Sequence, residues 1–286
     1  MEKKNLSVYV PVYNGEKFIK DCINSLLSQT LKPDQILIID DCSNDKTQEI
    51  LKSFSDKIRV IKNEQNRGIT YNRNLAINSL KTKYVASVDA DVVLAEDWME
   101  RQFNLITNKS VTLVCGRMYE KFINNPYNLW RSIRLKQHWG ENDLPNPPMI
   151  FGCNNLIDTS NLDLSKIYKN IYLKGDYFKL NGDDNELSKE LIKMNFKLYY
   201  NSEAICYHLQ DDDGKSLSKR YWRYIHYGDG LKKRNLYKTF KNIFRQFKKT
   251  LKWSIEDLIK LRFKLIKVNF LIFYNFAIID YQFFKK

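Results

Sequence analysis

The sequence predicts an α/β protein with a mostly parallel central sheet flanked by helices, followed by a basic helical extension. Through about residue 115, apolar runs of strand length alternate with segments of helical periodicity. The strand-like runs are apolar throughout, which is typical of a parallel sheet covered on both faces. With 286 residues, of which 43% are hydrophobic, the chain can build one large domain or two small ones without disulfides.

The expected elements follow one another in strand–helix order. The first strand begins at Leu6 and is expected to end at Pro11. After it come a helix over 18–27, a strand over 35–40, a helix over 45–54, a strand over 58–63, a helix over 69–80, and strands over 84–89 and 111–118. The pattern breaks between Tyr119 and Pro148 and resumes at 149–155, with a helix from Asp183 and a strand ending near His208.

Positive charge is concentrated at the C-terminal end. Residues 215–286 hold 19 Lys and Arg against 4 Asp and Glu, a net +15, which leaves 28 against 29 for residues 1–214. We therefore expect a near-neutral domain over 1–214 and a basic amphipathic helical tail over 215–286. Such a tail suits an anionic partner, either nucleic acid or an acidic membrane surface.

The tail also contains an apolar stripe at helical spacing, formed by Leu258, Leu261, Leu265, Val268 and Ile272, with Lys260, Lys264 and Lys267 on another face. The apolar run over 268–279 is well short of the roughly 20 residues that cross a bilayer. We expect the tail to lie on a membrane surface. Packing of the stripe on the domain or on a second subunit, as in a homodimer, is the alternative.

The cysteines indicate a reducing compartment. They are five in number, lie far apart and include no C-x-x-C pair, which argues against a disulfide framework or a zinc site. No apolar stretch of signal-peptide length precedes the first strand, so a cytoplasmic location is expected.

Two carboxylates end a buried strand at the edge where such sheets bind ligands. Asp89 and Asp91 follow the run over 84–88, and they would repel each other unless a divalent cation or a basic group neutralised them. Mg²⁺ and Mn²⁺ bind one or two carboxylates together with phosphate oxygens, so this pair predicts a metal and a nucleotide diphosphate. The motif alone is weak evidence, because Asp211 and Asp213 repeat it in what looks like a solvated turn.

Three further positions have both a structural and a functional interpretation. Of Asp40 and Asp41, one can cap the next helix while the other accepts a hydrogen bond from a base or ribose. Asp183 and Asp184 begin a helix, where they can complement its dipole or supply a general base. His208 ends a strand and is a candidate metal ligand, although a lone histidine is more often a core or surface residue.

Seven segments in this order resemble family 2 glycosyltransferases of the GT-A fold over roughly residues 5–230. They are "VYVPVYNGEKFIKDCINSLLSQT", "IIDDCSNDKT", "NRGITYNRNLAI", "VDADVVLAEDW", "FGCNN", "GDDNELSKEL" and "YHL". The resemblance implies an inverting transfer of a sugar from a nucleoside diphosphate donor, expected to be UDP-linked, with Mn²⁺ or Mg²⁺ as cofactor. The acceptor is expected to be a glycan or lipid-linked molecule used in envelope polysaccharide or glycoconjugate synthesis. The tail is expected to hold the protein at the inner face of the cell membrane, where such an acceptor is presented.

The resemblance also assigns roles to individual residues. The donor-binding set is Pro11 and Tyr13 in the nucleotide pocket, Asp41 at the base, Asp89 near the ribose and Asn154 facing the sugar. Asp91 would bind the metal, His208 would complete the metal site, and Asp184 would be the general base. Asp183 replaces the usual Glu, and it is expected with Trp98 on the acceptor side or just behind the site.

Two other classes of protein remain as alternatives. Nucleotidyltransferases that make nucleotide sugars also join an α/β sheet to metal-binding aspartates, but they usually open with a glycine-rich loop, and "VPVYNGEKF" has a single glycine. A nucleic-acid-binding protein would use the basic, aromatic tail. That alternative leaves the aspartates at the strand ends unexplained, so no nucleic-acid partner is expected.

Overall fold

The computed structural model of the chain describes residues 5–163, 167, 183–226 and 235–285. It consists of two compact units. The first comprises Met1–Lys121 and Gln137–Leu209, and the second comprises Phe122–Lys136 and Gln210–Lys286. The second unit therefore holds most of the expected tail together with a segment from the middle of the chain.

One half of the sheet in the first unit is parallel, as predicted. Its strands are β1 (Leu6–Val12), β2 (Gln35–Asp40), β3 (Arg59–Lys62) and β4 (Tyr84–Val88), in the order β3-β2-β1-β4. The connecting helices are α1 (Ile19–Leu27), α2 (Thr47–Lys52) and α3 (Ile69–Ser79). Every residue of β1 and β4 is buried, which explains why these strands are apolar throughout.

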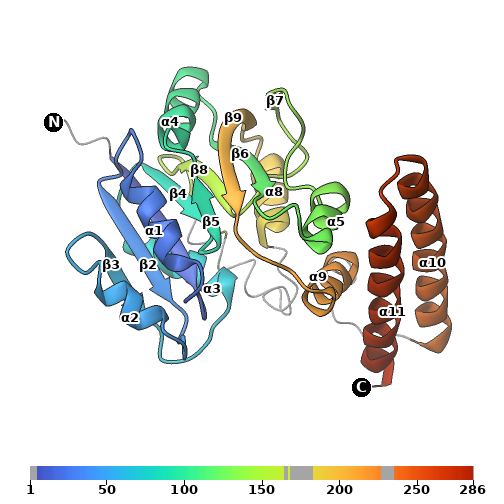
Figure 1. The fold of residues 1–286 in the computed structure, drawn as a ribbon. Helices are drawn as coiled ribbons and strands as arrows, with labels where there is room; N and C mark the ends of the chain where they lie inside the picture. Colours follow the sequence, from blue (N-terminus) through green and yellow to red (C-terminus); the bar gives the residue numbers. More distant parts are fainter. Residues whose placement is uncertain (1–4, 164–166, 168–182, 227–234, 286) are drawn as a thin grey trace. The chain divides into compact units, whose positions relative to one another are not determined.

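The other half of the sheet is mixed. It contains β5 (Val92–Leu94), β6 (Leu113–Glu120), β7 (Leu144–Pro145), β8 (Asn154–Asp158) and β9 (Leu198–His208), with α4 (Trp98–Lys109) and α8 (Asp183–Lys193). β8 lies between β4 and β6 and is antiparallel to both, while β5 and β7 are antiparallel to β9. Because β4 and β6 are both antiparallel to β8, and β9 is parallel to β6, the strands β4, β6 and β9 run the same way and their carboxyl ends share one edge of the sheet (Figure 1).

Pro11 does not end the first strand, which continues to Val12. β1 pairs with β2 as far as Val12, but it pairs with β4 only as far as Tyr9. Since proline has no N–H, the ladder is lost on one side at this position and kept on the other. The extension of β1 beyond Tyr9 brings its last residue, Val12, level with its partner Asp40 at the end of β2.

The second unit is helical and contains α5 (Pro126–Arg134), α9 (Gly214–His226), α10 (Leu236–Ile259) and α11 (Phe263–Lys285). α10 and α11 lie side by side as a hairpin, and α11 also packs against α9 and α5 (Figure 1). Asn125 caps α5 and Asn235 caps α10, each by accepting a backbone N–H with its side-chain oxygen. None of the helices in the described residues is long and apolar enough to span a bilayer.

The apolar stripe expected in the tail does not form one exposed face. Leu258 belongs to α10 and is exposed, whereas Leu265, Val268 and Ile272 belong to α11 and are buried inside the second unit. The chain turns between the two helices at Leu261, whose φ is 54°. The helical spacing therefore spans a helix break, and its α11 part is core.

Gly116 lies in β6 between Cys115 and Arg117, where the pairing of β6 with β9 shifts register. A Cβ at this position would lie 2.3 Å from the Ala204 carbonyl oxygen and 2.7 Å from Nε1 of the buried Trp98. We expect Gly116→Ala to lower the free energy of unfolding in urea by about 1–3 kcal/mol, because β6 and β9 must move apart. Ser55→Ala, at an exposed position, is the control. A loss below about 0.5 kcal/mol for Gly116→Ala would contradict this packing argument.

Candidate functional site

Strand register brings three side chains together at the carboxyl edge of the sheet. His208, the last residue of β9, pairs with Val92 of β5 on one side and with Glu120 of β6 on the other. Asp91 immediately precedes β5, and its carbonyl accepts a 2.7 Å hydrogen bond from the Leu209 amide. The backbone ladder therefore fixes His208 between the two carboxylates of Asp91 and Glu120.

The imidazole of His208 contacts both of these carboxylates. Its Nε2 lies 3.2 Å from an Asp91 oxygen and its Nδ1 lies 3.0 Å from a Glu120 oxygen. Burial alone lowers the pKa of His208, but the charge of Asp91 and the hydrogen bonds to Asp91 and Glu120 outweigh burial and raise it to about 9. The ring therefore carries a positive charge at neutral pH and balances a pair of carboxylates.

Asp89 has its own cationic partner. Nη2 of Arg73, a buried residue of α3, lies 3.1 Å from Oδ1 of Asp89, and the Asp89 amide donates to the Cys153 carbonyl. The guanidinium lies directly against Gly152, where a Cβ would come within 2.5 Å of Nη1. Only a residue without a side chain leaves room for Arg73 in this place.

The donor set around Asp91 fits a hard divalent cation. Asp91 supplies a carboxylate and His208 an imidazole nitrogen, while Glu120 holds the second ring nitrogen, as carboxylates do behind metal-bound histidines. A bound cation would balance the carboxylates that the imidazolium balances here. No group of three or more His, Cys, Asp or Glu side chains in ligand geometry occurs in the described part of the chain. Diphosphate oxygens and water would complete the shell, as is usual for Mg²⁺.

Asp40 and Asp41 at the end of β2 have different partners. Asp40 accepts from the Ser43 amide and from Gln48, and so supports the start of the next helical segment. Asp41 is buried and accepts hydrogen bonds of 2.8 Å from Asn63 and from the amides of Arg67 and Gly68. Asp41 therefore orders the loop before α3, and its assignment to the base stays a prediction.

The end of β1 provides an exposed aromatic ring. Tyr13 directly follows the strand and is 51% exposed, whereas Pro11 is buried within the strand. The neighbouring loop is fixed because the Asn14 amide donates to Ser43 and the Gly15 amide donates to Thr47. Tyr13 is thus presented on a rigid loop next to Asp41.

Asp184 lies in the first turn of α8 and is half-buried. Burial, followed by the charges of Asp89, Cys206 and Asp184, raises the pKa of the Cys153 thiol well above its usual value. Ser188 of α8 donates to the Asp184 carbonyl and accepts from the Ile150 amide, so the start of α8 lies beside the segment that leads to Cys153, whose carbonyl accepts from the Asp89 amide. Asp183 is the first residue of α8, and its side chain lies outside the described residues.

The side chains of Asn154 and Trp98 are buried in the core. Asn154 is fully buried, accepts from the Gly116 amide at 2.8 Å and donates to the Cys206 sulfur. Only its backbone reaches the edge, where it pairs with Val88. Trp98 is fully buried in the core below β6, so its ring is not available to an acceptor.

The second Asp-x-Asp motif is structural. Asp213 accepts hydrogen bonds from the amides of Lys215 and Ser216 at the start of α9, and Asp211 accepts a 2.6 Å hydrogen bond from the Asn125 side chain. Both residues belong to the second unit. Position at a strand end, and not the motif, distinguishes Asp89 and Asp91.

Sequence reasoning missed Arg73 and Glu120. Arg73 lies within the motif "NRGITYNRNLAI", at a buried helix position where an unpaired cation would be costly, and this was the available signal. Glu120 ends an apolar strand just as Asp89 does. Its importance depends on pairing with β9, and a single sequence does not show that pairing.

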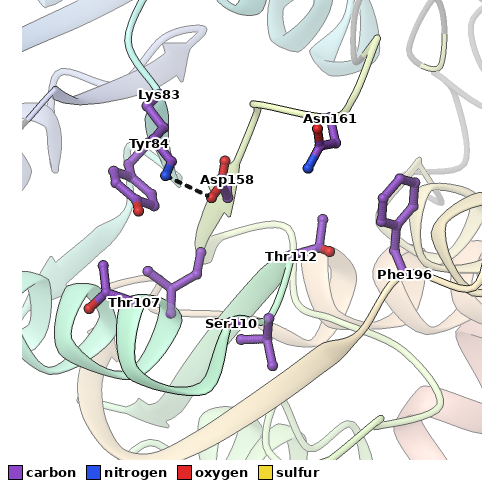
Figure 2. Close-up of a pocket in the computed structure, with 10 residues that line it drawn as sticks. Lys83, Tyr84, Thr107, Ser110, Thr112, Asp158, Asn161 and Phe196 are labelled. Carbon is purple, nitrogen blue, oxygen red and sulfur yellow. Dashed lines mark ion pairs between the residues drawn. The ribbon is translucent and has the colours of Figure 1, made fainter.

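A cavity of about 270 Å³ lies at the opposite edge of the sheet. Lys83, which precedes β4, and Asp158, which ends β8, form a 3.6 Å ion pair in its wall, and Tyr84 and Phe196 also line it (Figure 2). None of the predicted site residues belongs to its described lining. The cavity is therefore separate from the Asp91–His208 cluster.

Residues 7–163 match the model of the family described as glycosyl transferase family 2. The match covers more than half of the chain, so the chain belongs to this family, and its fold is GT-A, as the motifs predicted. The family favours sugar transfer over the nucleotidyltransferase and nucleic-acid alternatives.

The relatives are matched over part of their length. GlyG of Streptococcus pneumoniae is 31% identical over 117 residues, which cover 40% of this chain and 39% of GlyG. TuaG of Bacillus subtilis, named for teichuronic acid biosynthesis, is 32% identical over 146 residues, which cover 47% of this chain and 58% of TuaG. The matched segment spans less than two thirds of either relative.

Two similar solved structures contain nucleotide sugars. Staphylococcus aureus TarS 1–349 in complex with UDP-GlcNAc has a TM-score of 0.57 at 19% identity, covering 76% of this chain and 64% of that one. The mannosyltransferase PcManGT from Pyrobaculum calidifontis, in complex with GDP-Man and Mn²⁺, has a TM-score of 0.57 at 15% identity, covering 79% and 64%. At these identities the similarity shows the fold alone.

The contact between Gly152 and Arg73 gives a structural prediction. In Gly152→Ala the new Cβ would overlap the end of a long side chain, so we expect Arg73 to move and its 3.1 Å contact with Asp89 to break while the fold is kept. A crystal structure of the variant measures the distance. Cys153→Ser adds no atom and should leave the ion pair intact. An unchanged Arg73–Asp89 pair in Gly152→Ala would show that the glycine is not required.

Proposed function

We propose that the protein is an inverting, metal-dependent glycosyltransferase that moves a sugar from a UDP-linked donor to a glycan or lipid-linked acceptor of the cell envelope. The observation that carries this proposal is the cluster of Asp91, His208 and Glu120 beside the Arg73–Asp89 pair, at the ligand-binding edge of a family 2 fold. TuaG supports an envelope polysaccharide as product, and TarS supports a UDP-sugar as donor.

Asp91 and His208 would hold Mn²⁺ or Mg²⁺, with Glu120 orienting the histidine ring. When bound, such an ion supplies Lewis-acid stabilisation of the leaving diphosphate. The ion in PcManGT is consistent with this cofactor. Asp89, whose charge is compensated by Arg73, lies two residues before Asp91 and would contact the ribose.

The donor nucleotide would lie across the ends of β1 and β2. Tyr13 offers an exposed ring against which a base can stack, and Asp41 keeps the loop over 63–68 in place beside it. The three hydrogen bonds that Asp41 accepts leave one lone-pair site of its carboxylate for the base.

Asp184 would accept the proton of the acceptor hydroxyl. The place of Asp184 in the first turn of α8 supports this role, because Ser188 of the same helix bonds the Ile150 amide in the segment that leads to Cys153. Removal of the proton lets the oxygen attack the anomeric carbon from the face opposite the diphosphate, which inverts the configuration.

Asp91 is expected to control donor binding in the presence of metal. Asp91→Ala should weaken UDP binding in Mn²⁺ by at least about tenfold, because one of the two protein ligands is lost. Isothermal titration calorimetry with and without Mn²⁺ measures the effect. Asp56→Ala, at an exposed position of the same unit, is the control. If Asp91→Ala bound UDP in Mn²⁺ as tightly as the wild type does, Asp91 would not be a metal ligand.

Asp184 is expected to act on the acceptor and not on the donor. Asp184→Asn keeps the shape of the side chain but cannot take a proton, so transfer should fall by at least about 10²-fold with UDP affinity retained. A coupled assay of UDP release with an acceptor, beside calorimetry, separates the two effects. Transfer within a few-fold of wild type would reduce Asp184 to a helix-capping residue.

A further inference from the structure

In α10 the faces are exchanged relative to an ordinary amphipathic helix of a soluble domain, because polar residues are buried and large apolar residues are exposed. Its buried residues are polar: Thr239, Asn242, Gln246, Thr250 and Asp257. Gln246 accepts a 2.7 Å hydrogen bond from Tyr221 of α9, and Asn242 donates to Asp280 of α11 at 3.1 Å. The inner side of the helix is thus held by polar contacts, and by the ring of Trp253 against Trp130 and Tyr221, within the second unit.

The outer side of α10 is apolar. One set of exposed apolar residues, between 36% and 72% exposed, consists of Tyr237, Phe240, Phe244, Phe247, Leu251, Ile255 and Leu258. Their spacing of three or four residues places them on one face, over about 30 Å of helix length. We call this face the α10 stripe. Soluble proteins rarely expose a continuous apolar surface of this kind without a partner for it.

A column of positive charge runs beside the α10 stripe. It consists of Lys241, Arg245, Lys248 and Lys252, all exposed. Lys241, Lys248 and Lys252 each follow a stripe residue by one position, which is a rotation of about 100° around the helix. An apolar strip bordered by cations matches the boundary between acyl chains and anionic headgroups of a bilayer.

Other occupants fit this surface less well. A second copy of the chain would bring two basic columns together, which costs free energy. Single-stranded nucleic acid stacks on aromatic rings, but the C-terminal half of the stripe consists of aliphatic Leu251, Ile255 and Leu258, which offer no ring. The polar inner side suits a helix that lies in the plane of an interface.

We propose that α10 docks the protein on an anionic membrane, with the α10 stripe in the acyl boundary and the basic column at the headgroups. The docking helix is α10, and the α11 part of the stripe expected from the sequence is core. The inference goes beyond sugar transfer, and it does not depend on it.

The test is cosedimentation of the full chain with vesicles. Vesicles of phosphatidylcholine alone and of an equimolar mixture with phosphatidylglycerol are compared at low and high salt. The wild type should bind the anionic vesicles at low salt and lose most of this binding in high salt. A variant with Phe240→Gln and Phe244→Gln, called the stripe variant, should bind them at least about tenfold more weakly, because two exposed rings that can insert are gone. Phe247 is kept because its ring packs on Phe273 of α11.

Matched controls lie on the first unit. Val60→Gln with Ile192→Gln removes exposed apolar side chains elsewhere, and Lys20→Gln, Lys52→Gln and Lys57→Gln together remove exposed charges elsewhere. Both controls should bind vesicles as the wild type does. Far-ultraviolet circular dichroism and UDP calorimetry on every variant show that each is folded, and they report on donor binding separately from membrane binding.

Three outcomes would overturn the proposal. The first is a wild-type protein that ignores anionic vesicles at low salt, and the second is a stripe variant that binds them as tightly as the wild type. The third is loss, in the stripe variant, of a dimer seen by analytical ultracentrifugation or of binding to a single-stranded oligonucleotide. That result would assign the α10 stripe to a second copy or to nucleic acid.

Discussion

The charge balance around His208 is the interaction on which the site depends. A buried imidazole that contacts two carboxylates is stable only if the strands that carry them keep their register. β9 supplies His208, β6 supplies Glu120, and the turn before β5 supplies Asp91. Two features set this register: β8 is antiparallel to both β4 and β6, and the pairing of β6 with β9 shifts at Gly116. Together they let β6 and β9 end at the same edge as β4.

The same rule of compensation holds along the rest of the edge. Asp89 is balanced by Arg73, and Asp41 is satisfied by an amide side chain and two backbone amides, so the carboxylates are held by the protein before any ligand binds. Such preorganisation lowers the cost of ordering the site when a nucleotide arrives. It also explains why this edge tolerates so much negative charge next to the core.

The parallel half of the sheet and the edge that carries the site could be predicted, because apolar strands and the polar residues that follow them are local signals. The positions of Asp89, Asp91 and His208 at this edge were predicted in this way. Their partners Arg73 and Glu120 were not, since pairing depends on the order of strands. A motif position also does not reveal that a side chain is buried, as the side chains of Asn154 and Trp98 are. In the tail, the helical spacing of apolar residues continues across the helix break at Leu261, so the sequence pattern did not separate α10 from α11 or indicate the exposed apolar face of α10.

The central claim is that Asp91 and His208 form one metal site with the donor diphosphate. A crystal structure with UDP and Mn²⁺, with the ion located by its anomalous scattering, tests it most directly. The account predicts a peak bonded at roughly 2.0–2.3 Å to an Asp91 oxygen and to Nε2 of His208, with Nδ1 still on Glu120 and diphosphate oxygens completing the shell. A manganese peak elsewhere, with His208 Nε2 still hydrogen-bonded to Asp91, would contradict it.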